Sequence, residues 1–123
     1  MYRLMVESGF AAAHQLKEYE GKCENLHGHN WRVQVMVKTD RLNSIGLGID
    51  FKILKNILNE IVSQLDHTVL NNISPFNVKN PSSENLACFI FEEFLKRLDK
   101  KTLQMDWVRV WESSTAFAQY SLD

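Results

Sequence analysis

The chain has 123 residues, which is enough for one domain with a hydrophobic core, and we expect residues 1–123 to form a single domain. Its net charge of −1 gives no reason to expect nucleic acid or an anionic membrane as a partner. No apolar run reaches the roughly 18 residues that a membrane-spanning helix needs. Two cysteines argue against a disulfide framework, and residues 1–7 do not resemble a signal peptide, so we expect a cytoplasmic protein.

Alternating apolar residues predict two long strands in the first third of the chain. The first covers about residues 2–14 and has Phe10 and His14 on its apolar face. The second covers about residues 27–39, with His27 and His29 on the apolar face, and the residues between the strands form a polar loop. If the two strands pair as antiparallel neighbours, His14 can meet His27 and His29.

Two amphipathic helices are expected in the middle of the chain. Asp50 is a suitable N-cap for the first, and Ser82 for the second, which also has Glu84 near its positively polarised end. A loop of about residues 71–81 separates them. The expected apolar stripes consist of Phe51, Leu54, Ile57, Leu58, Ile61, Val62 and Leu65 in the first helix and Leu86, Phe89, Ile90, Phe94 and Leu98 in the second.

Alternation returns over about residues 105–112 and 117–122, which predicts two further strands. The order strand, strand, helix, helix, strand, strand predicts an α+β domain: a four-stranded antiparallel sheet with two helices on one face. Apolar side chains also fall on the other face of the strands, and an open sheet has two unpaired edges, so we expect an oligomer. These outward apolar residues are Met5, Met36, Trp107 and Trp111.

Three of the four histidines have the spacing of a metal site. His27 and His29 form a His-Gly-His pair that shares one strand face, and His14 ends the neighbouring strand. Three nitrogen ligands leave one open position on a tetrahedral metal, as in catalytic sites. Neutral imidazoles suit zinc best, although other divalent ions stay open. The alternative is a set of hydrogen-bonded core histidines.

The two cysteines have different surroundings in the sequence. Cys23 lies in a polar loop four residues before His27, where a nearby dication would favour the thiolate. It could then be a base, a nucleophile or a fourth metal ligand; the simpler alternative is a small buried side chain. Cys88 lies inside the second helix and is expected in the core.

Three more polar residues are candidates for chemistry. His67 follows Asp66, whose carboxylate can fix the tautomer of the ring; the alternative is a cationic cap at the end of the first helix. Glu112 lies at the end of an apolar strand. It could accept two hydrogen bonds from an amidine-like edge of a ligand, or it could be a solvated strand end.

Taken together, six ordered motifs resemble the 6-pyruvoyl-tetrahydropterin synthase family, over nearly the whole chain. The three residues between Cys23 and His27 resemble its bacterial carboxy-forming branch. Ser82 and Ser113 stand where the family usually has threonine, and both keep the hydroxyl. The motifs are Phe10-Ala11-Ala12-Ala13-His14; Cys23-x-x-x-His27-Gly28-His29; Ile49-Asp50-Phe51; Leu65-Asp66-His67 with Leu70-Asn71; Asn80-Pro81-Ser82-Ser83-Glu84-Asn85; and Val110-Trp111-Glu112-Ser113.

The resemblance implies a tunnelling fold, in which subunits join their sheets into a barrel. It implies a homohexamer made of two trimers, with active sites between subunits. It also implies zinc on His14, His27 and His29. The catalytic residues that it implies are Cys23 as general base, Asp66 with His67 as proton relay, and Glu112 on the 2-amino-pyrimidinone edge of a pterin.

The implied activity is that of a zinc-dependent carbon–carbon lyase in queuosine (7-deazaguanine) synthesis. It would convert 7,8-dihydroneopterin triphosphate into 6-carboxy-5,6,7,8-tetrahydropterin, acetaldehyde and triphosphate. Lys17, Lys22 and Arg32 are candidates for holding the triphosphate. Two alternatives stay open: formation of 6-pyruvoyl-tetrahydropterin from the same substrate, and a zinc-binding module without catalysis.

Overall fold

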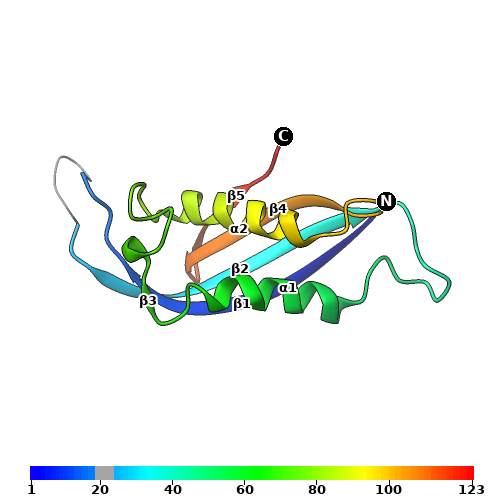
Figure 1. Cartoon of the computed structure of the whole chain (residues 1–123), viewed down its shortest axis with the longest axis horizontal. Helices are drawn as coiled ribbons and strands as arrows, with labels where there is room; N and C mark the ends of the chain where they lie inside the picture. The colour runs from blue at the N-terminus through cyan, green and yellow to red at the C-terminus, as the bar shows by residue number, and fades with distance from the viewer. Residues whose placement is uncertain (19–23) are drawn as a thin grey trace.

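The computed structural model describes residues 1–18 and 24–123, which form a five-stranded sheet with two helices on one face (Figure 1). The expected α+β class and the expected pair of helices are therefore confirmed. The elements in chain order are β1 (Tyr2–His14), β2 (His27–Thr39), α1 (Phe51–Ser63), β3 (Thr68–Val69), the 3-10 helix η1 (Leu70–Asn72), α2 (Ser83–Arg97), β4 (Gln104–Ser113) and β5 (Ala116–Tyr120).

The sheet has the strand order β3-β1-β2-β4-β5, so the expected count of four strands is wrong by one. The additional strand, β3, has two residues and runs parallel to β1, whereas the other neighbours are antiparallel. It forms where the chain leaves α1 and returns along β1, and His67 N–H donates to the Ala11 carbonyl at 2.6 Å. Two residues are too few for alternation to reveal a strand.

The long β1–β2 hairpin sets the register of the sheet. His14 stands opposite His27, and the pairing continues without a break to Tyr2 opposite Thr39. Gly9 lies against the backbone of Trp31, where a Cβ atom would come within 2.8 Å of the Trp31 carbonyl oxygen. The glycine in the middle of β1 therefore permits a close backbone approach.

Both helices begin where the sequence predicts. Asp50 Oδ1 accepts from Lys52 N–H at 2.9 Å, and Ser82 Oγ accepts from Asn85 N–H at 3.1 Å. The first helix differs from expectation in two respects. It stops at Ser63, before Leu65, and Phe51 is 56% exposed instead of joining the core. Each cap satisfies a backbone donor that the first turn of a helix leaves unpaired.

The core lies between the two helices and the facing side of the sheet. β2 contributes three fully buried valines, and β4 contributes two. Cys88, expected in the core, is half-buried. The inward valines are Val33, Val35, Val37, Val108 and Val110.

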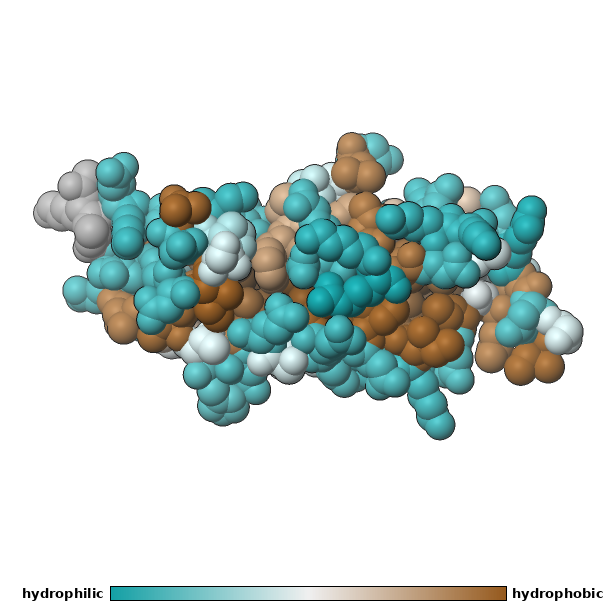
Figure 2. Space-filling model, in the orientation of Figure 1, coloured by the Kyte–Doolittle hydropathy of each residue, from teal (hydrophilic) through white to brown (hydrophobic). Residues whose placement is uncertain are grey.

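The other face of the sheet combines aromatic and charged side chains. The Arg32 guanidinium lies 4.2 Å from the ring centre of Trp111, and that of Arg109 lies 4.0 Å from that of Trp107. Apolar side chains also emerge on the loop after β2, where Ile45 is 77% exposed, and Figure 2 shows a hydrophobic projection at that end of the molecule. Neither α1 nor α2 is long and apolar enough to cross a membrane.

Candidate metal centre

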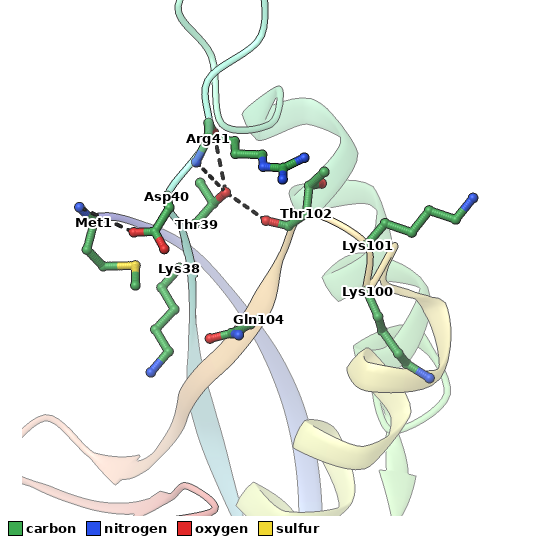
Figure 3. Close-up of a pocket in the computed structure, with 9 residues that line it drawn as sticks. All are labelled: Met1, Lys38, Thr39, Asp40, Arg41, Lys100, Lys101, Thr102 and Gln104. Atoms are coloured by element: carbon green, nitrogen blue, oxygen red, sulfur yellow. Dashed lines mark hydrogen bonds and ion pairs between the residues drawn. The ribbon is translucent and has the colours of Figure 1, made fainter.

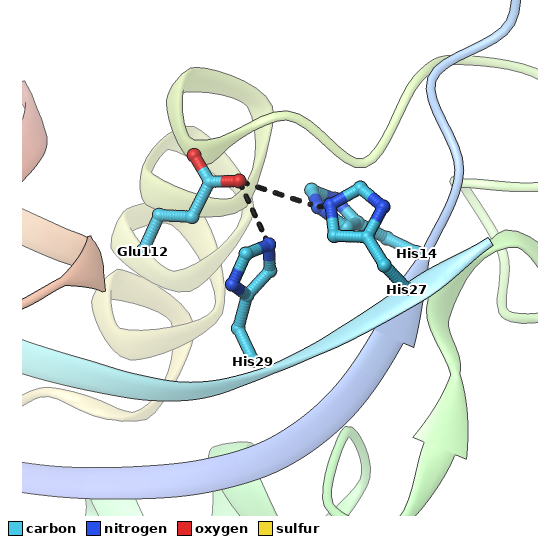
Figure 4. A group of neighbouring side chains, drawn as sticks. All are labelled: His14, His27, His29 and Glu112. Atoms are coloured by element: carbon cyan, nitrogen blue, oxygen red, sulfur yellow. Dashed lines mark hydrogen bonds and ion pairs between the residues drawn. The ribbon is translucent and has the colours of Figure 1, made fainter. Parts of the chain in front are cut away.

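The histidines lie together at the loop end of the β1–β2 hairpin (Figure 4). His14 is the last residue of β1, His27 and His29 open β2, and Glu112 reaches toward them from the end of β4. One ligand atom from each of these four residues lies within 4.8 Å of the other three. His14 is only 1% exposed. The structure therefore brings together the three histidines predicted from spacing and adds a carboxylate beside them.

Backbone carbonyl groups fix the orientation of two of the rings. His14 Nδ1 lies 2.8 Å from the Pro81 oxygen, and His27 Nδ1 lies 2.8 Å from the Asn25 oxygen. A carbonyl oxygen only accepts hydrogen bonds, so each Nδ1 must carry the proton, and a neutral ring then has its lone pair on Nε2. Such outer hydrogen bonds are the usual partners of metal-binding histidines.

The two Nε2 atoms lie only 3.1 Å apart. Two lone pairs at this distance repel each other unless a proton or a metal ion lies between them. In a tetrahedral zinc site with Zn–N bonds of 2.0–2.1 Å, two ligand nitrogens are about 3.3 Å apart. The spacing of His14 and His27 therefore fits two ligands of one ion.

The third ring adds a buried nitrogen with no hydrogen bond. Within the described part of the chain, His29 Nε2 makes none, although Glu112 Oε1 lies 2.9 Å away. Burial is the main cause that lowers the pKa of His29; the neighbouring His14 and His27 act in the same direction and Glu112 opposes them. A lowered pKa favours the neutral ring, which is the form that binds a metal. The three histidines thus supply a donor set that zinc accepts.

Glu112 is nearer to the histidines than the sequence indicates. Its Oε1 lies 2.9 Å from His29 Nε2 and 3.4 Å from His14 Nε2, while its side chain stays 40% exposed. The other oxygen points away from the rings in Figure 4. The signal available in the sequence was that Glu112 shares the face of Val108 and Val110, the same face that bears the histidines on β2.

Asp66 and His67 lie at the turn after α1 and are not joined to the histidine cluster. Asp66 Oδ1 accepts from Ala11 N–H at 2.9 Å, and Oδ2 lies 3.0 Å from His67 Nδ1. The Ala11 amide holds the pKa of Asp66 below its ordinary value, with a further contribution from the nearby His67.

The His67 side chain is 83% exposed, and its backbone has a φ of 57°. It lines a shallow hollow with Ala11, Ala13 and Asn30, which His29 also borders. Because side chains alternate along a strand, those of Ala11, Ala13 and Asn30 point to the side of the sheet opposite the histidine side chains of β1 and β2. Within one chain, the predicted relay pair therefore belongs to a different surface. Cys23, the predicted base, lies outside the described residues.

A second hollow, at the other end of the sheet, has a different character (Figure 3). Thr39 Oγ1 donates there to the Thr102 carbonyl at 2.7 Å. The hollow contains no histidine or cysteine; in residues 1–18 and 24–123, the histidine cluster is the only group with the ligands and spacing of a metal site. The basic residues of this second hollow are Lys38, Arg41, Lys100 and Lys101.

The helices lie on one side of a mostly antiparallel sheet, and three histidines lie at the loop end of its long hairpin. This defines a small α+β domain with a candidate metal centre. The chain belongs to the 6-pyruvoyl tetrahydropterin synthase family, whose model matches residues 3–123. The expected family is therefore confirmed.

Individual relatives cover almost the full length of the chain. It is 38% identical to the 6-carboxy-5,6,7,8-tetrahydropterin synthase of Synechocystis sp., over 98% of this chain and 93% of the relative. It is 33% identical to the dihydroneopterin monophosphate aldolase of Pyrococcus furiosus, over 91% and 90%. The fold matches the 6-pyruvoyl tetrahydropterin synthase of Caenorhabditis elegans with a TM-score of 0.86 at 23% identity, covering 99% of this chain and 96% of that one.

Proposed function

We propose that the protein is a zinc-dependent lyase that converts 7,8-dihydroneopterin triphosphate into 6-carboxy-5,6,7,8-tetrahydropterin, acetaldehyde and triphosphate, in queuosine synthesis. Membership of the family and the identity with the Synechocystis enzyme support a pterin lyase. The three residues between Cys23 and His27 support the carboxy-forming branch. The observation that carries the proposal is the approach of two oriented Nε2 atoms to 3.1 Å.

In this proposal His14, His27 and His29 hold the zinc ion. The carbonyl groups of Pro81 and Asn25 keep the first two rings in the tautomer that presents Nε2 to the ion. A bound zinc ion supplies Lewis-acid catalysis, because it makes the side-chain hydroxyls of the substrate more acidic. Three histidine ligands would leave room on the ion for those hydroxyls.

Glu112 would hold the pterin ring. A carboxylate accepts two parallel hydrogen bonds from the 2-amino-pyrimidinone edge, which presents two N–H donors in one plane. The exposed fraction of Glu112 and the outward direction of its second oxygen support this role. Its position beside His29 would keep the ring close to the metal ligands.

Proton transfer would be shared by Cys23 as general base and His67 as relay, with Asp66 orienting the His67 ring. Asp66 and His67 lie on the opposite side of the sheet from the histidines of their own chain. We therefore propose that a neighbouring copy supplies this pair, in a homohexamer of two trimers whose sheets join into a barrel. Two open edges support joining: β3 covers β1 only at Ala12 and Ala13, and β5 has no outer neighbour among the described strands.

The test is a product assay with metal analysis on the same purified sample. We expect bound zinc, and release of both triphosphate and acetaldehyde from 7,8-dihydroneopterin triphosphate. Triphosphate without acetaldehyde would identify the 6-pyruvoyl-forming activity instead. No turnover from a zinc-loaded protein would identify a binding module. Conversion of dihydroneopterin monophosphate in place of the triphosphate would identify an activity like that of the Pyrococcus relative.

Replacing Cys23 separates its role from that of the histidines. The Cys23→Ala variant should keep its zinc while turnover falls by at least 100-fold, since loss of a general base costs about 10²–10⁴-fold. The control is His29→Ala, which should lose zinc and turnover together. Loss of zinc from Cys23→Ala would make the cysteine a ligand rather than the base.

A further inference from the structure

Two asparagine side chains pair with the backbone directly after His14. Asn71 Oδ1 accepts from Gln15 N–H at 2.9 Å, and its Nδ2 donates to the Gln15 carbonyl at 2.7 Å. Asn80 Oδ1 accepts from Lys17 N–H at 2.8 Å, and its Nδ2 donates to the Lys17 carbonyl at 3.0 Å. Each carboxamide thus satisfies both polar groups of one residue, as a peptide group of a neighbouring strand would.

These asparagines take over where strand pairing ends. β3 pairs with β1 as far as Ala13 opposite Val69, and Gln15 and Lys17 follow beyond the sheet. Alternate residues of an extended chain present their N–H and C=O groups to the same side, so residues 15 and 17 need partners on one side. Asn71 and Asn80 together substitute for the missing continuation of a neighbouring strand.

Asn80 also connects this backbone to the His14 ring. Its own carbonyl accepts from Asn85 Nδ2 at 2.8 Å, in the first turn of α2. The next carbonyl along the chain, that of Pro81, is the one 2.8 Å from His14 Nδ1. Residues 80 and 81 therefore hold His14 in two ways: Asn80 binds the backbone that follows His14, and Pro81 binds its ring nitrogen.

We infer that Asn71 and Asn80 are positioning residues for His14, which fix where its Nε2 lies relative to His27 and His29. The inference rests on the proposed metal-binding function of the cluster. A metal ligand must sit within a few tenths of an ångström of its ideal distance, so a shift of the β1 end would weaken binding. Asparagine is specific for this task because a carboxamide both donates and accepts, whereas an aspartate would place a second oxygen against the Lys17 or Gln15 carbonyl.

The variants are Asn80→Asp, which keeps size and changes one donor into an acceptor, and Asn71→Ala, which removes both contacts at the other position. Asn72→Ala and Asn77→Ala are matched controls, because both residues are exposed and neither side chain is hydrogen-bonded within the described part of the chain. Two measurements are made on each protein: amide hydrogen exchange of residues 15–17 after metal removal, and zinc affinity by chelator competition.

In the two test variants we expect hydrogen exchange of residues 15–17 to be at least 10-fold faster, and zinc affinity to fall by about 10- to 100-fold, the usual cost of losing a partner behind a metal ligand. The controls should match the wild type in both. Unchanged zinc affinity in Asn80→Asp and Asn71→Ala would overturn the inference. Weakened affinity without faster exchange at residues 15–17 would also overturn it, since the loss of affinity would then not act through the backbone that follows His14.

The wild-type protein separates this inference from the proposed function. If the wild type binds no zinc, the proposed metal function fails, and with it the role assigned to the asparagines. If the wild type binds zinc and the test variants bind it equally well, only the positioning role fails. A thermal unfolding curve of each metal-free variant confirms that it is folded before either measurement is interpreted.

Discussion

His14 and His27 approach each other because a backbone carbonyl group fixes the Nδ1 side of each ring. Each Nδ1 donates to a carbonyl group of a loop, and each Nε2 is left facing the other. The spacing of the histidines predicts which residues meet. It does not predict the carbonyl partners, since the direction of a loop carbonyl has no signature in side-chain type. Alternation places Glu112 on the face that bears the histidines, but the direction of its side chain toward His29 depends on the pairing of β2 with β4.

The role of Glu112 can be separated from those of the histidines by one substitution. Glu112→Gln keeps the shape of the side chain but replaces one acceptor with an amide donor, which repels an N–H edge of a ligand. We expect zinc affinity within about threefold of wild type and a fall of at least 100-fold in kcat/KM, a loss of about 2.7 kcal/mol of transition-state binding. Zinc loss in this variant would show instead that the carboxylate is a metal ligand.

Asp66 should make stability depend on acid pH. The Ala11 amide depresses its pKa in the folded protein, so its contribution is present above the unfolded pKa of about 3.9 and is lost as pH falls through the lower folded value. Asp66→Asn keeps an oxygen that can accept from Ala11 but carries no charge.

We therefore expect the variant to be less stable than wild type at about pH 6, and the gap to shrink at about pH 3. Urea unfolding of both proteins at the two pH values measures it. A gap that stays constant would mean that the charge of Asp66 does not contribute to stability.

At the scale of elements, the sequence was most informative where a pattern is long. Alternation over 13 residues located β1 and β2 with the bounds that the structure has, and cap residues located the starts of both helices. β3 was missed because its two residues are selected by pairing with β1, a tertiary contact. The prediction that Phe51 is in the core is wrong because helical periodicity does not show how far along the helix the sheet covers its apolar stripe.

The β1–β2 pairing makes two glycines respond differently to the same substitution. At Gly9 an added methyl group would lie 2.8 Å from the Trp31 oxygen, while at Gly28 it would meet only the Ala12 oxygen at 3.9 Å, an ordinary contact. We expect Gly9→Ala to lower the free energy of unfolding by about 1–3 kcal/mol, as overpacking does, and Gly28→Ala to change it little. Denaturant unfolding of the metal-free variants measures both changes. Equal free energies of unfolding for the two variants would mean that β1 and β2 move apart at Gly9 without a loss of stability.

At the scale of the whole molecule, the candidate catalytic groups of one chain are divided between two faces of its sheet. The side chains of the histidines and Glu112 lie on the side of the helices. His67 lines a hollow with Ala11, Ala13 and Asn30 of the other side, which His29 also borders. The motifs of the sequence predict these candidate residues. They do not show that one chain keeps them apart, because the side to which a turn such as Asp66–His67 delivers its side chains depends on its pairing with β1.

Mixing two inactive variants tests whether neighbouring copies complete each other. If Cys23 and His67 of one site come from different chains, co-refolded Cys23→Ala and His67→Ala proteins regain activity at about a quarter of their sites, since random assembly leaves both residues intact there. Light scattering of the same sample gives the oligomer mass. Each variant refolded alone is the control, and an oligomer without regained activity would place both residues of a site in one chain.

The long hairpin has one more consequence. Its register is held by the buried Trp31 and the valines that follow it, and a slip by one residue would turn all of them, together with His27 and His29, to the wrong face. The histidines are therefore aligned by hydrophobic packing before any ion arrives, unlike the ligands of a zinc finger, which need the ion in order to fold. The protein should thus persist as a folded empty form. On the proposed zinc function, a chelator would remove the ion reversibly and leave the protein folded.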